Sequence, residues 1–426
     1  MRGNTRYWRL VVGGIIAVSM VFSASAVVLA ADPATAGLSA EIEVLKERLS
    51  KLENELTAQQ AGAEPGSAVV QLPSGFHGVQ MSGFVDTSYT YNFNEPTART
   101  NSFRVFDTRS GDFMINNAEL VIEKPVSAEA PIGFRTDLNF GADAEVVGSV
   151  TTGLGSQTDE LDLQQGYVEY LAPIGNGLDL KFGKFVTLHG AEVIEAKDNW
   201  NFSRSYLFGF AIPFTHTGLR ASYPWTEWLT TCFGVNNGWD VVDDNNKAKT
   251  LEFSATLTPF ERFSLISTYM LGAEQTSDSR DQRHLIDLVA SYQPIDKLTL
   301  KLNFDYGAEQ DAVDEAGGGD ATWNGVALYA KYDITDKWSM AGRWEVFNDQ
   351  DGVRTAVNSA ASSPTGDPIT DLRLMEWTFT TEYKLNAHLI ARLEYRVDQA
   401  NEQVFRHHQG LDNAQNTLAV EFIAPF

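Results

Sequence analysis

The sequence predicts an all-β protein, a 16-stranded antiparallel transmembrane β-barrel preceded by a short periplasmic coiled-coil helix. Three observations lead to this fold class. Apolar and polar residues alternate over many short segments, the segments come to an even number, and the connections between them are alternately short and long. Short turns on one rim and long loops on the other are typical of outer-membrane barrels, whereas a soluble β-sandwich has no reason to sort its connections in this way.

Composition excludes several other classes. The 426 residues include 32 lysines and arginines against 56 aspartates and glutamates, a formal charge of −24 that would repel nucleic acid. No segment after residue 31 holds the roughly 18 uninterrupted apolar residues that a spanning helix needs, which excludes a helical membrane protein. Cys232 is the only cysteine, so an intrachain disulfide and a thiolate metal cluster are excluded. We expect no cofactor and no metal site.

Residues 1–31 are predicted to be a signal peptide. Arg2, Arg6 and Arg9 form a positive start, the segment from Leu10 to Phe22 is apolar, and small residues follow it. Cleavage is expected after residue 26 or near residue 31. An uncleaved membrane anchor is the alternative. The protein is therefore expected to be exported.

Residues 38–60 are predicted to form a coiled-coil oligomerisation helix, and residues 61–75, rich in glycine and proline, a linker. If Ile42 occupies an a position, Glu41 faces Lys46 and Arg48 faces Glu53 across a parallel bundle, and both pairs are opposite in sign. These pairs favour self-association, although one amphipathic helix lying on a domain is the alternative. The apolar residues at heptad spacing are Leu38, Ile42, Leu45, Leu49, Leu52 and Leu56.

Residues 76–426 are predicted to form the barrel. The segment Leu298–Tyr306, for example, places leucines and aromatic residues on one face and polar residues on the other. Such alternation suits a sandwich as well as a membrane barrel, and the sorted connection lengths decide between them. The expected strands lie near residues 79–93, 113–124, 132–141, 160–172, 178–186, 215–223, 228–236, 249–258, 262–273, 284–293, 298–308, 323–333, 338–348, 372–384, 387–398 and 416–426.

Aromatic residues gather near strand ends, as the interfacial girdles of a membrane barrel require. The last expected strand ends on Phe426, which resembles the assembly signal of bacterial outer-membrane proteins. The predicted location is therefore the bacterial outer membrane, with membrane lipid and lipopolysaccharide as partners. Both ends of the barrel segment are expected on the rim with short turns, on the periplasmic side.

A barrel of about sixteen strands leaves an aqueous channel that side chains cannot fill. The inward faces that we infer carry charges of both signs and little apolar bulk, which suits water better than a packed core. For each such residue, bracing of the wall is the alternative to solute selection. The predicted pore-lining residues are Arg135, Asp137, Lys181, Arg220, Arg343, Glu345, Glu382, Arg392, Glu394 and Arg396.

Four segments resemble a known family. Residues 166–170 (GYVEY), 177–185 (GLDLKFGKF), 189–192 (HGAE) and 198–205 (DNWNFSRS) are similar to the β-barrel porin family described as OmpL-like. The resemblance covers residues 76–426 and implies passive solute diffusion across a Gram-negative outer membrane. The leading hypothesis is a homotrimeric porin for small hydrophilic solutes and ions. The heptad segment resembles that of phosphate- and polyphosphate-selective porins, but the lysine-rich ladder of those channels is not evident.

The third long loop, Thr187–Phe214, is the longest and resembles the third loop of general porins in order and length. We expect it to narrow the channel, with Glu192, Glu195 and Asp198 facing wall bases such as Arg135, Lys181 and Arg220. A lid or a subunit latch on the outer rim is the alternative. The predicted constriction residues are His189, Glu192, Glu195, Lys197, Asp198, Trp200 and Arg204.

Other functions stay open at this point. A substrate-selective channel for anions, sugars or organic acids would need a continuous track of bases or aromatic residues. An outer-membrane hydrolase could use His189, His216, His284 or the pair His407 and His408, but no nucleophile motif accompanies them. A structural tether to the cell wall is a third possibility. The sequence therefore favours a diffusion channel and no enzyme.

Overall fold

The computed structural model describes residues 78–148, 160–313, 319–359, 363–408 and 410–426. The expected signal peptide (1–31), coiled coil (38–60) and linker (61–75) lie outside the described residues. No described helix is both long enough and apolar enough to cross a bilayer.

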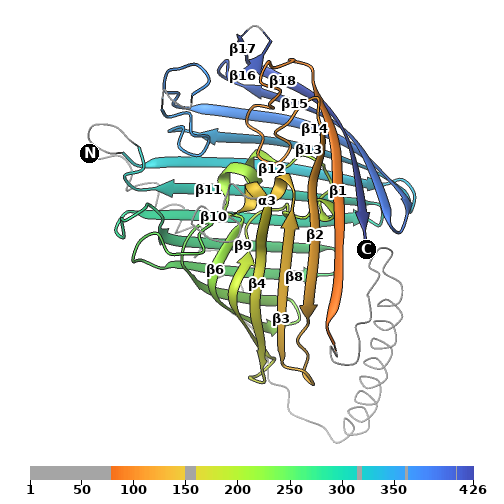
Figure 1. Ribbon diagram of the computed structural model, residues 1–426. Coiled ribbons are helices and arrows are strands. Elements are labelled where there is room, and N and C mark those ends of the chain that lie inside the picture. Colours follow the sequence, from red (N-terminus) through yellow and green to blue (C-terminus); the bar gives the residue numbers. More distant parts are fainter. Residues whose placement is uncertain (1–77, 149–159, 314–318, 360–362, 409) are drawn as a thin grey trace, which may run out of the picture. The chain divides into compact units, whose positions relative to one another are not determined.

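Sixteen antiparallel strands form one closed barrel, in the order β1-β18-β15-β14-β13 and onward down to β2 (Figure 1). This confirms the predicted barrel, and every predicted strand is present within a few residues. The strands are β1 (Gln80–Asn92), β2 (Phe113–Lys124), β3 (Ile132–Phe140), β4 (Leu161–Ala172), β5 (Leu178–Val186), β6 (Thr215–Thr226), β7 (Leu229–Asn236), β8 (Thr250–Phe260), β9 (Phe263–Ala273), β10 (Gln282–Ile295), β11 (Leu298–Glu309), β12 (Ala321–Asp333), β13 (Trp338–Asp349), β14 (Leu372–Asn386), β15 (Leu389–Ala400) and β18 (Ala414–Pro425).

The long connections contain structure that the alternation does not predict. A two-stranded hairpin, β16 (Phe405–His407) and β17 (Gly410–Asp412), lies in the connection between β15 and β18. The connection after β3 contains the helix α3 (Ala142–Val147), which packs against β2, β3 and β4. The connection between β5 and β6 contains the 3-10 turn η1 (Ala196–Asp198) and the π-helical turn η2 (Leu207–Ala211).

The two faces of the barrel differ as predicted. On the outer face Leu302 is 38% exposed, Trp377 46% and Phe379 57%. On the inner face Arg343 and Arg392 are each only 2% exposed. Because a charge facing lipid at mid-depth costs about 2–4 kcal/mol, this sorting is what a membrane barrel requires.

Three short turns are tighter than expected because their prolines belong to the strands. Pro224, Pro259 and Pro294 lie near the ends of β6, β8 and β10, although we expected them in the connections. At each of these places the pairing with the next strand shifts register. A proline cannot donate a ladder hydrogen bond, so it is tolerated where the ladder is already irregular.

The barrel closes between β1 and β18, which lie side by side in Figure 1. At the short-turn rim, Gly83 N donates to Phe426 O at 3.0 Å and Phe426 N donates to Gly83 O at 2.9 Å. Both ends of the barrel segment therefore lie on this rim, as expected. The role of Phe426 as an assembly signal stays a prediction.

The interior differs from the expectation of little apolar bulk. Apolar side chains from the long loops and from the loop ends of several strands form one buried cluster inside the barrel. The apolar segment 206–214 supplies much of it, because these residues have no lipid to face and must bury against one another. Members of the cluster include Phe106, Leu207, Phe208, Ile212, Trp239, Trp323 and Phe347.

Candidate functional site

The loop 187–214, which we call the constriction loop, enters the barrel. At its start Ala191 N donates to Asn303 Oδ1 on β11 at 3.1 Å, and further along Asn201 Nδ2 donates to Thr380 Oγ1 on β14 at 2.7 Å. Asn303 and Thr380 are both buried side chains of the inner wall. The loop therefore starts between β5 and β6 and reaches the opposite wall, and it is not a lid on the outer rim.

Carboxylates of that wall accept hydrogen bonds from the loop backbone. Glu394 on β15 accepts from Phe202 N at 2.7 Å and from Ser203 N at 3.0 Å. Glu345 on β13 accepts from Tyr206 N at 2.6 Å and from Leu207 N at 3.2 Å. Each glutamate uses both of its carboxylate oxygens, one for each backbone N–H, so the two side chains hold the loop at two neighbouring places.

Arginines of the same wall donate to the loop carbonyls. Arg343 donates to Ser203 O at 2.6 Å, and Arg396 donates to Arg204 O at 2.6 Å. Arg392 donates to Ala196 O at 2.9 Å and to Asn199 O at 2.7 Å. The alternating acids and bases on β13 and β15 thus form a receptor for the loop.

These wall arginines are themselves paired with acids. Arg343 Nε lies 2.6 Å from Glu376 Oε1, and Arg396 Nε lies 2.7 Å from Asp398 Oδ1. Arg392 is held between Glu382 at 2.8 Å and Glu421 at 3.1 Å. Five of the ten predicted pore-lining residues contact the loop, and Glu382 supports one of them. Their part in permeation stays a prediction.

The other four predicted wall residues lie away from this receptor. Arg135 on β3 pairs with Asp137 and Glu123, and Lys181 on β5 pairs with Glu169 at 3.3 Å. Both basic side chains are about 30% exposed. They are therefore accessible to water, unlike the buried arginines of β13 and β15.

The expected pairing of loop acids with Arg135, Lys181 and Arg220 is wrong. Glu192 pairs with Arg343 at 2.6 Å, and Asp198 pairs with its neighbour Lys197 at 2.6 Å. Glu195 lies beside two other acids, Glu119 and Asp137. Arg135 and Lys181 pair with acids of their own or the adjacent strand, and Arg220 on β6 pairs with Glu252 on β8, two strands away. All these acids are closer along the sheet than those of the loop.

The remaining predicted loop residues shape the loop itself. Arg204 Nη1 donates to Phe202 O at 2.7 Å, and its Nη2 donates to Ile194 O at 2.5 Å. The ammonium of Lys301 on β11 lies 4.3 Å from the ring centroid of Trp200, a cation–π distance. Arg204 therefore closes the loop on itself, and Trp200 attaches it to β11.

The ionisation of Glu192, which belongs to the loop and not to a strand, follows from its partners. Burial raises its pKa, but Arg343 and the hydrogen-bond donors of Ser205 outweigh burial, so the pKa lies below its ordinary value. Glu192 therefore keeps its negative charge inside the barrel. The ion pair with Arg343 is a permanent contact at neutral pH.

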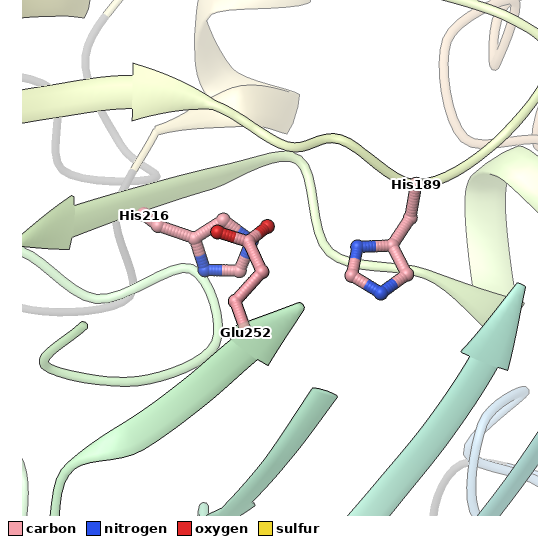
Figure 2. Close-up of side chains that lie close together, drawn as sticks. All are labelled: His189, His216 and Glu252. Atoms are coloured by element: carbon pink, nitrogen blue, oxygen red, sulfur yellow. The ribbon is translucent and has the colours of Figure 1, made fainter. Parts of the chain in front are cut away.

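A cluster of His189, His216 and Glu252 is shown in Figure 2, with one potential ligand atom of each within 4.8 Å of the others. Glu252 already accepts two hydrogen bonds from Arg220, at 2.8 and 2.9 Å. His216 contacts Gly238 O through Nδ1 at 3.1 Å and Thr187 Oγ1 through Nε2 at 3.2 Å. With both His216 nitrogens engaged and an arginine on the glutamate, the cluster is better suited to hydrogen bonding than to metal binding.

Thr187 links the two histidines, because its hydroxyl also lies 3.1 Å from His189 Nδ1. Burial lowers the pKa of His189, a loop residue, to about 3. The imidazole is therefore neutral at physiological pH. The hydrogen bonds through Thr187 tie the first residues of the constriction loop to β6.

Sequence reasoning missed a second loop inside the barrel. Arg104, in the connection between β1 and β2, lies 2.5 Å from Asp398 on β15, and the Tyr206 hydroxyl donates to the same carboxylate at 2.6 Å. Arg104 stands between Phe103 and Val105, and apolar neighbours around a charge in a long connection are the signal that could have found it.

The closed barrel with long loops on one rim, two of which fold inside, defines an outer-membrane porin. The family model described as "Putative beta-barrel porin-2, OmpL-like" matches residues 78–426. The chain belongs to this family, and it is a channel of the outer membrane. A search of the curated proteins found no match.

Solved structures share the fold at low sequence identity. An anion-selective porin from Comamonas acidovorans is 12% identical, with a TM-score of 0.55 over 82% of this chain and 99% of its own. The outer membrane channel DcaP of Acinetobacter baumannii is 14% identical, with a TM-score of 0.53 over 82% and 97%. A loop-deletion mutant of OmpT, an outer membrane protein of Vibrio cholerae, is 10% identical, with a TM-score of 0.52 over 82% and 99%.

Proposed function

We propose that the water-filled channel of this porin lets small hydrophilic solutes and ions diffuse passively, and that the constriction loop sets its width. The observation that carries the proposal is the receptor on β13 and β15. Glu345 and Glu394 accept backbone N–H groups of the loop, and Arg343, Arg392 and Arg396 donate to its carbonyls. Because both N–H groups and carbonyl groups of the loop backbone are hydrogen-bonded to the wall, the loop is held rigidly in the lumen.

Several polar groups on other parts of the inner wall support a hydrated path. Asn117 on β2 is fully buried, and neither its amide nitrogen nor its amide oxygen has a hydrogen-bond partner in the described part of the chain. The same holds for one carboxylate oxygen of Asp86 on β1 and one of Glu421 on β18. Polar groups of this kind in a closed barrel are expected to bind water.

The decisive experiment is a planar-bilayer recording with the purified protein. We expect discrete conductance steps that scale with bulk salt conductivity, as a water-filled pore requires. A single-channel conductance that saturates as the concentration of one class of solute rises would favour a substrate-selective channel for anions, sugars or organic acids. A strong reversal potential in a salt gradient would favour it too. A complete lack of conductance would overturn the proposal.

We further propose a homotrimer, with the segment 38–60 assisting its assembly and residues 1–31 removed during export. The heptad spacing of Ile42, Leu45, Leu49, Leu52 and Leu56 supports self-association. Native mass measurement of the full protein and of a variant lacking residues 38–60 tests this. We expect the full protein to have three times the mass of a monomer, and the variant lacking residues 38–60 to form less trimer or none. A monomer in both cases would contradict the proposed trimer.

We also propose that the protein is not an enzyme. The histidines that could have served a hydrolase are in part accounted for by structure, because His189 and His216 share Thr187 and hold the loop start. Purified protein should show no esterase or protease activity above that of a His189→Gln variant. A measurable activity that this variant loses would contradict the proposal.

A further inference from the structure

Three carboxylates meet on the wall beside the constriction loop. Glu119 on β2, Asp137 on β3 and Glu195 in the loop each place one oxygen within 4.8 Å of the others. Glu119 and Asp137 are almost completely buried. Like charges so close together in a region of low dielectric repel strongly unless a proton or a cation lies between them.

The cluster has too few positive partners among the described residues. Arg135 Nε donates to both oxygens of Asp137, at 2.9 and 3.0 Å, and Gln165 Nε2 also donates to its Oδ2. Lys197, two residues after Glu195, pairs with Asp198 at 2.6 Å, so these two charges cancel. One guanidinium against three carboxylates leaves about two negative charges uncompensated if all three are ionised.

Two oxygens at this place have no partner in the described part of the chain. Glu119 Oε1 is buried and accepts no hydrogen bond there. Asn139 lies directly opposite Glu119 in the β2–β3 ladder and is fully buried, and its Oδ1 is also unpartnered. Both groups are held on the inner wall by strands whose register is fixed.

The orientation of the Asn139 amide follows from a chain of hydrogen bonds. Asn139 Nδ2 donates to Gln164 Oε1, and Gln164 Nε2 donates to Glu195 Oε1 at 2.6 Å. Because Asn139 Nδ2 is engaged in this hydrogen bond, only the amide oxygen of Asn139 is free to coordinate a cation. The chain also connects the wall to the loop residue that completes the cluster.

We propose that Glu119, Glu195 and the amide oxygen of Asn139 bind one divalent cation of the Ca²⁺ class. Asp137, whose oxygens are engaged by Arg135 and Gln165, adds negative charge beside it. The donors are all oxygens, which hard cations prefer, and Ca²⁺ tolerates the irregular geometry of side chains from two strands and a loop. A doubly charged ion matches the two uncompensated negative charges. The bound ion fastens the loop to β2 and β3, away from the receptor on β13 and β15.

The site gives the channel a dependence on calcium. With the ion removed, the repulsion between Glu195 and the two wall acids pushes this part of the loop from β2 and β3. The receptor still holds the loop through Ala196 and Asn199. We therefore expect a change in conductance without loss of the fold.

The test uses the full protein in detergent, stripped with a chelator and titrated with Ca²⁺ by calorimetry. Glu119→Gln and Glu195→Gln should each weaken one binding event by about tenfold or more. Glu195→Gln is a mild change, because a glutamine oxygen still accepts from Gln164. Asp305→Asn, on the inner wall at β11, is the matched control and should keep the event.

Heat-modifiability on gels should show that all variants remain folded. In bilayers, chelation should change the conductance of the wild type and leave that of Glu119→Gln unchanged. Equal Ca²⁺ binding by the wild type and both glutamine variants would overturn the proposal, as would a wild type that binds no Ca²⁺. Because binding is measured without conductance, this failure is distinct from failure of the proposed channel function.

Discussion

The guanidinium of Arg343 lies 2.6 Å from the carboxylate of Glu192, and both side chains are buried. Arg343 is on β13, whereas Glu192 belongs to the loop that follows β5, eight strands away around the barrel. The ion pair therefore joins opposite parts of the wall through the interior. Arg343 also pairs with Glu376, so it keeps one partner if Glu192 is removed. Removing Arg343 instead would leave the carboxylate of Glu192 buried without its ion pair, which costs about 3–5 kcal/mol.

Replacing Glu394 with alanine should release the constriction loop. The change leaves the N–H groups of Phe202 and Ser203 without their acceptor, at a cost of about 1–3 kcal/mol each. We expect a larger and noisier single-channel conductance in planar bilayers, because the loop no longer holds one position.

Glu169→Ala is the control for this experiment. Glu169 on β4 pairs with Lys181 at 3.3 Å, so its removal takes one negative charge from the inner wall and leaves the receptor intact. If Glu169→Ala raised the conductance as much as Glu394→Ala, lost charge and not loop release would be the cause.

Gly325→Ala should disturb the seat of the loop on β12. A methyl group at Gly325 would lie 2.6 Å from Leu207 Cδ1 and 2.8 Å from Val346 O. Overpacking of this kind costs about 1–3 kcal/mol. The melting temperature should fall, and the loop should become more sensitive to protease. At Gly342 on β13 the nearest atoms would be 3.9 and 4.0 Å away, so Gly342→Ala should behave as wild type.

Leu302→Lys tests the depth of the membrane around β11. Leu302 faces outward near the middle of the strand, whereas Leu298 lies at its periplasmic end on the same face. A lysine at the bilayer midplane costs about 2–4 kcal/mol, and one near the interface about 0–1 kcal/mol. Folding titrations into lipid vesicles should therefore show a large penalty for Leu302→Lys and a small one for Leu298→Lys. Equal penalties would contradict this placement.

Acid should loosen the start of the constriction loop through His189. Burial lowers the pKa of His189 from 6.5 to about 3, so the fold favours the neutral ring. The stability that this ring contributes is complete above pH 6.5 and is lost as the pH falls toward 3. At pH 4.5 the loss amounts to at most about 3 kcal/mol.

The measurement compares melting between pH 7.5 and 4.5 for the wild type, His189→Gln and His388→Gln. The His189 variant should lose less stability on acidification than the wild type. His388 lies exposed in a short turn, and its variant should follow the wild type. If His189→Gln lost as much stability on acidification as the wild type, groups other than His189 would govern the acid response.

The strands could be predicted because a membrane barrel leaves a simple pattern. In β11, every second residue from Leu298 to Tyr306 must face lipid, and the turn that precedes it is short. The alternation of apolar and polar residues is interrupted where the strand pairing shifts register. For this reason the prediction placed Pro224, Pro259 and Pro294 in turns and not in strands. The position of the constriction loop in the chain could also be inferred from its length.

The contents of the barrel could not be predicted in the same way. The charges of Arg343, Glu345, Arg392, Glu394 and Arg396 indicated an inner face, but alternation does not show whether such a face meets water or a loop. Their partners lie 139 to 196 residues away in the chain for several of these contacts. The apolar segment from Tyr206 to Phe214 was visible in the sequence, yet nothing local determines that it packs against Trp323 and Phe347.

The seam between β1 and β18 has a consequence for how the protein folds. Thr87 and Phe422 are paired across it although 335 residues separate them. Contacts between such distant residues form slowly, since the entropy of closing a long loop is lost before the contact is gained. Until this pair forms, both strands present open hydrogen-bonding edges that invite aggregation. The newly exported chain therefore passes through a stage in which β1 and β18 can pair with other chains, and this stage ends only when the ring closes.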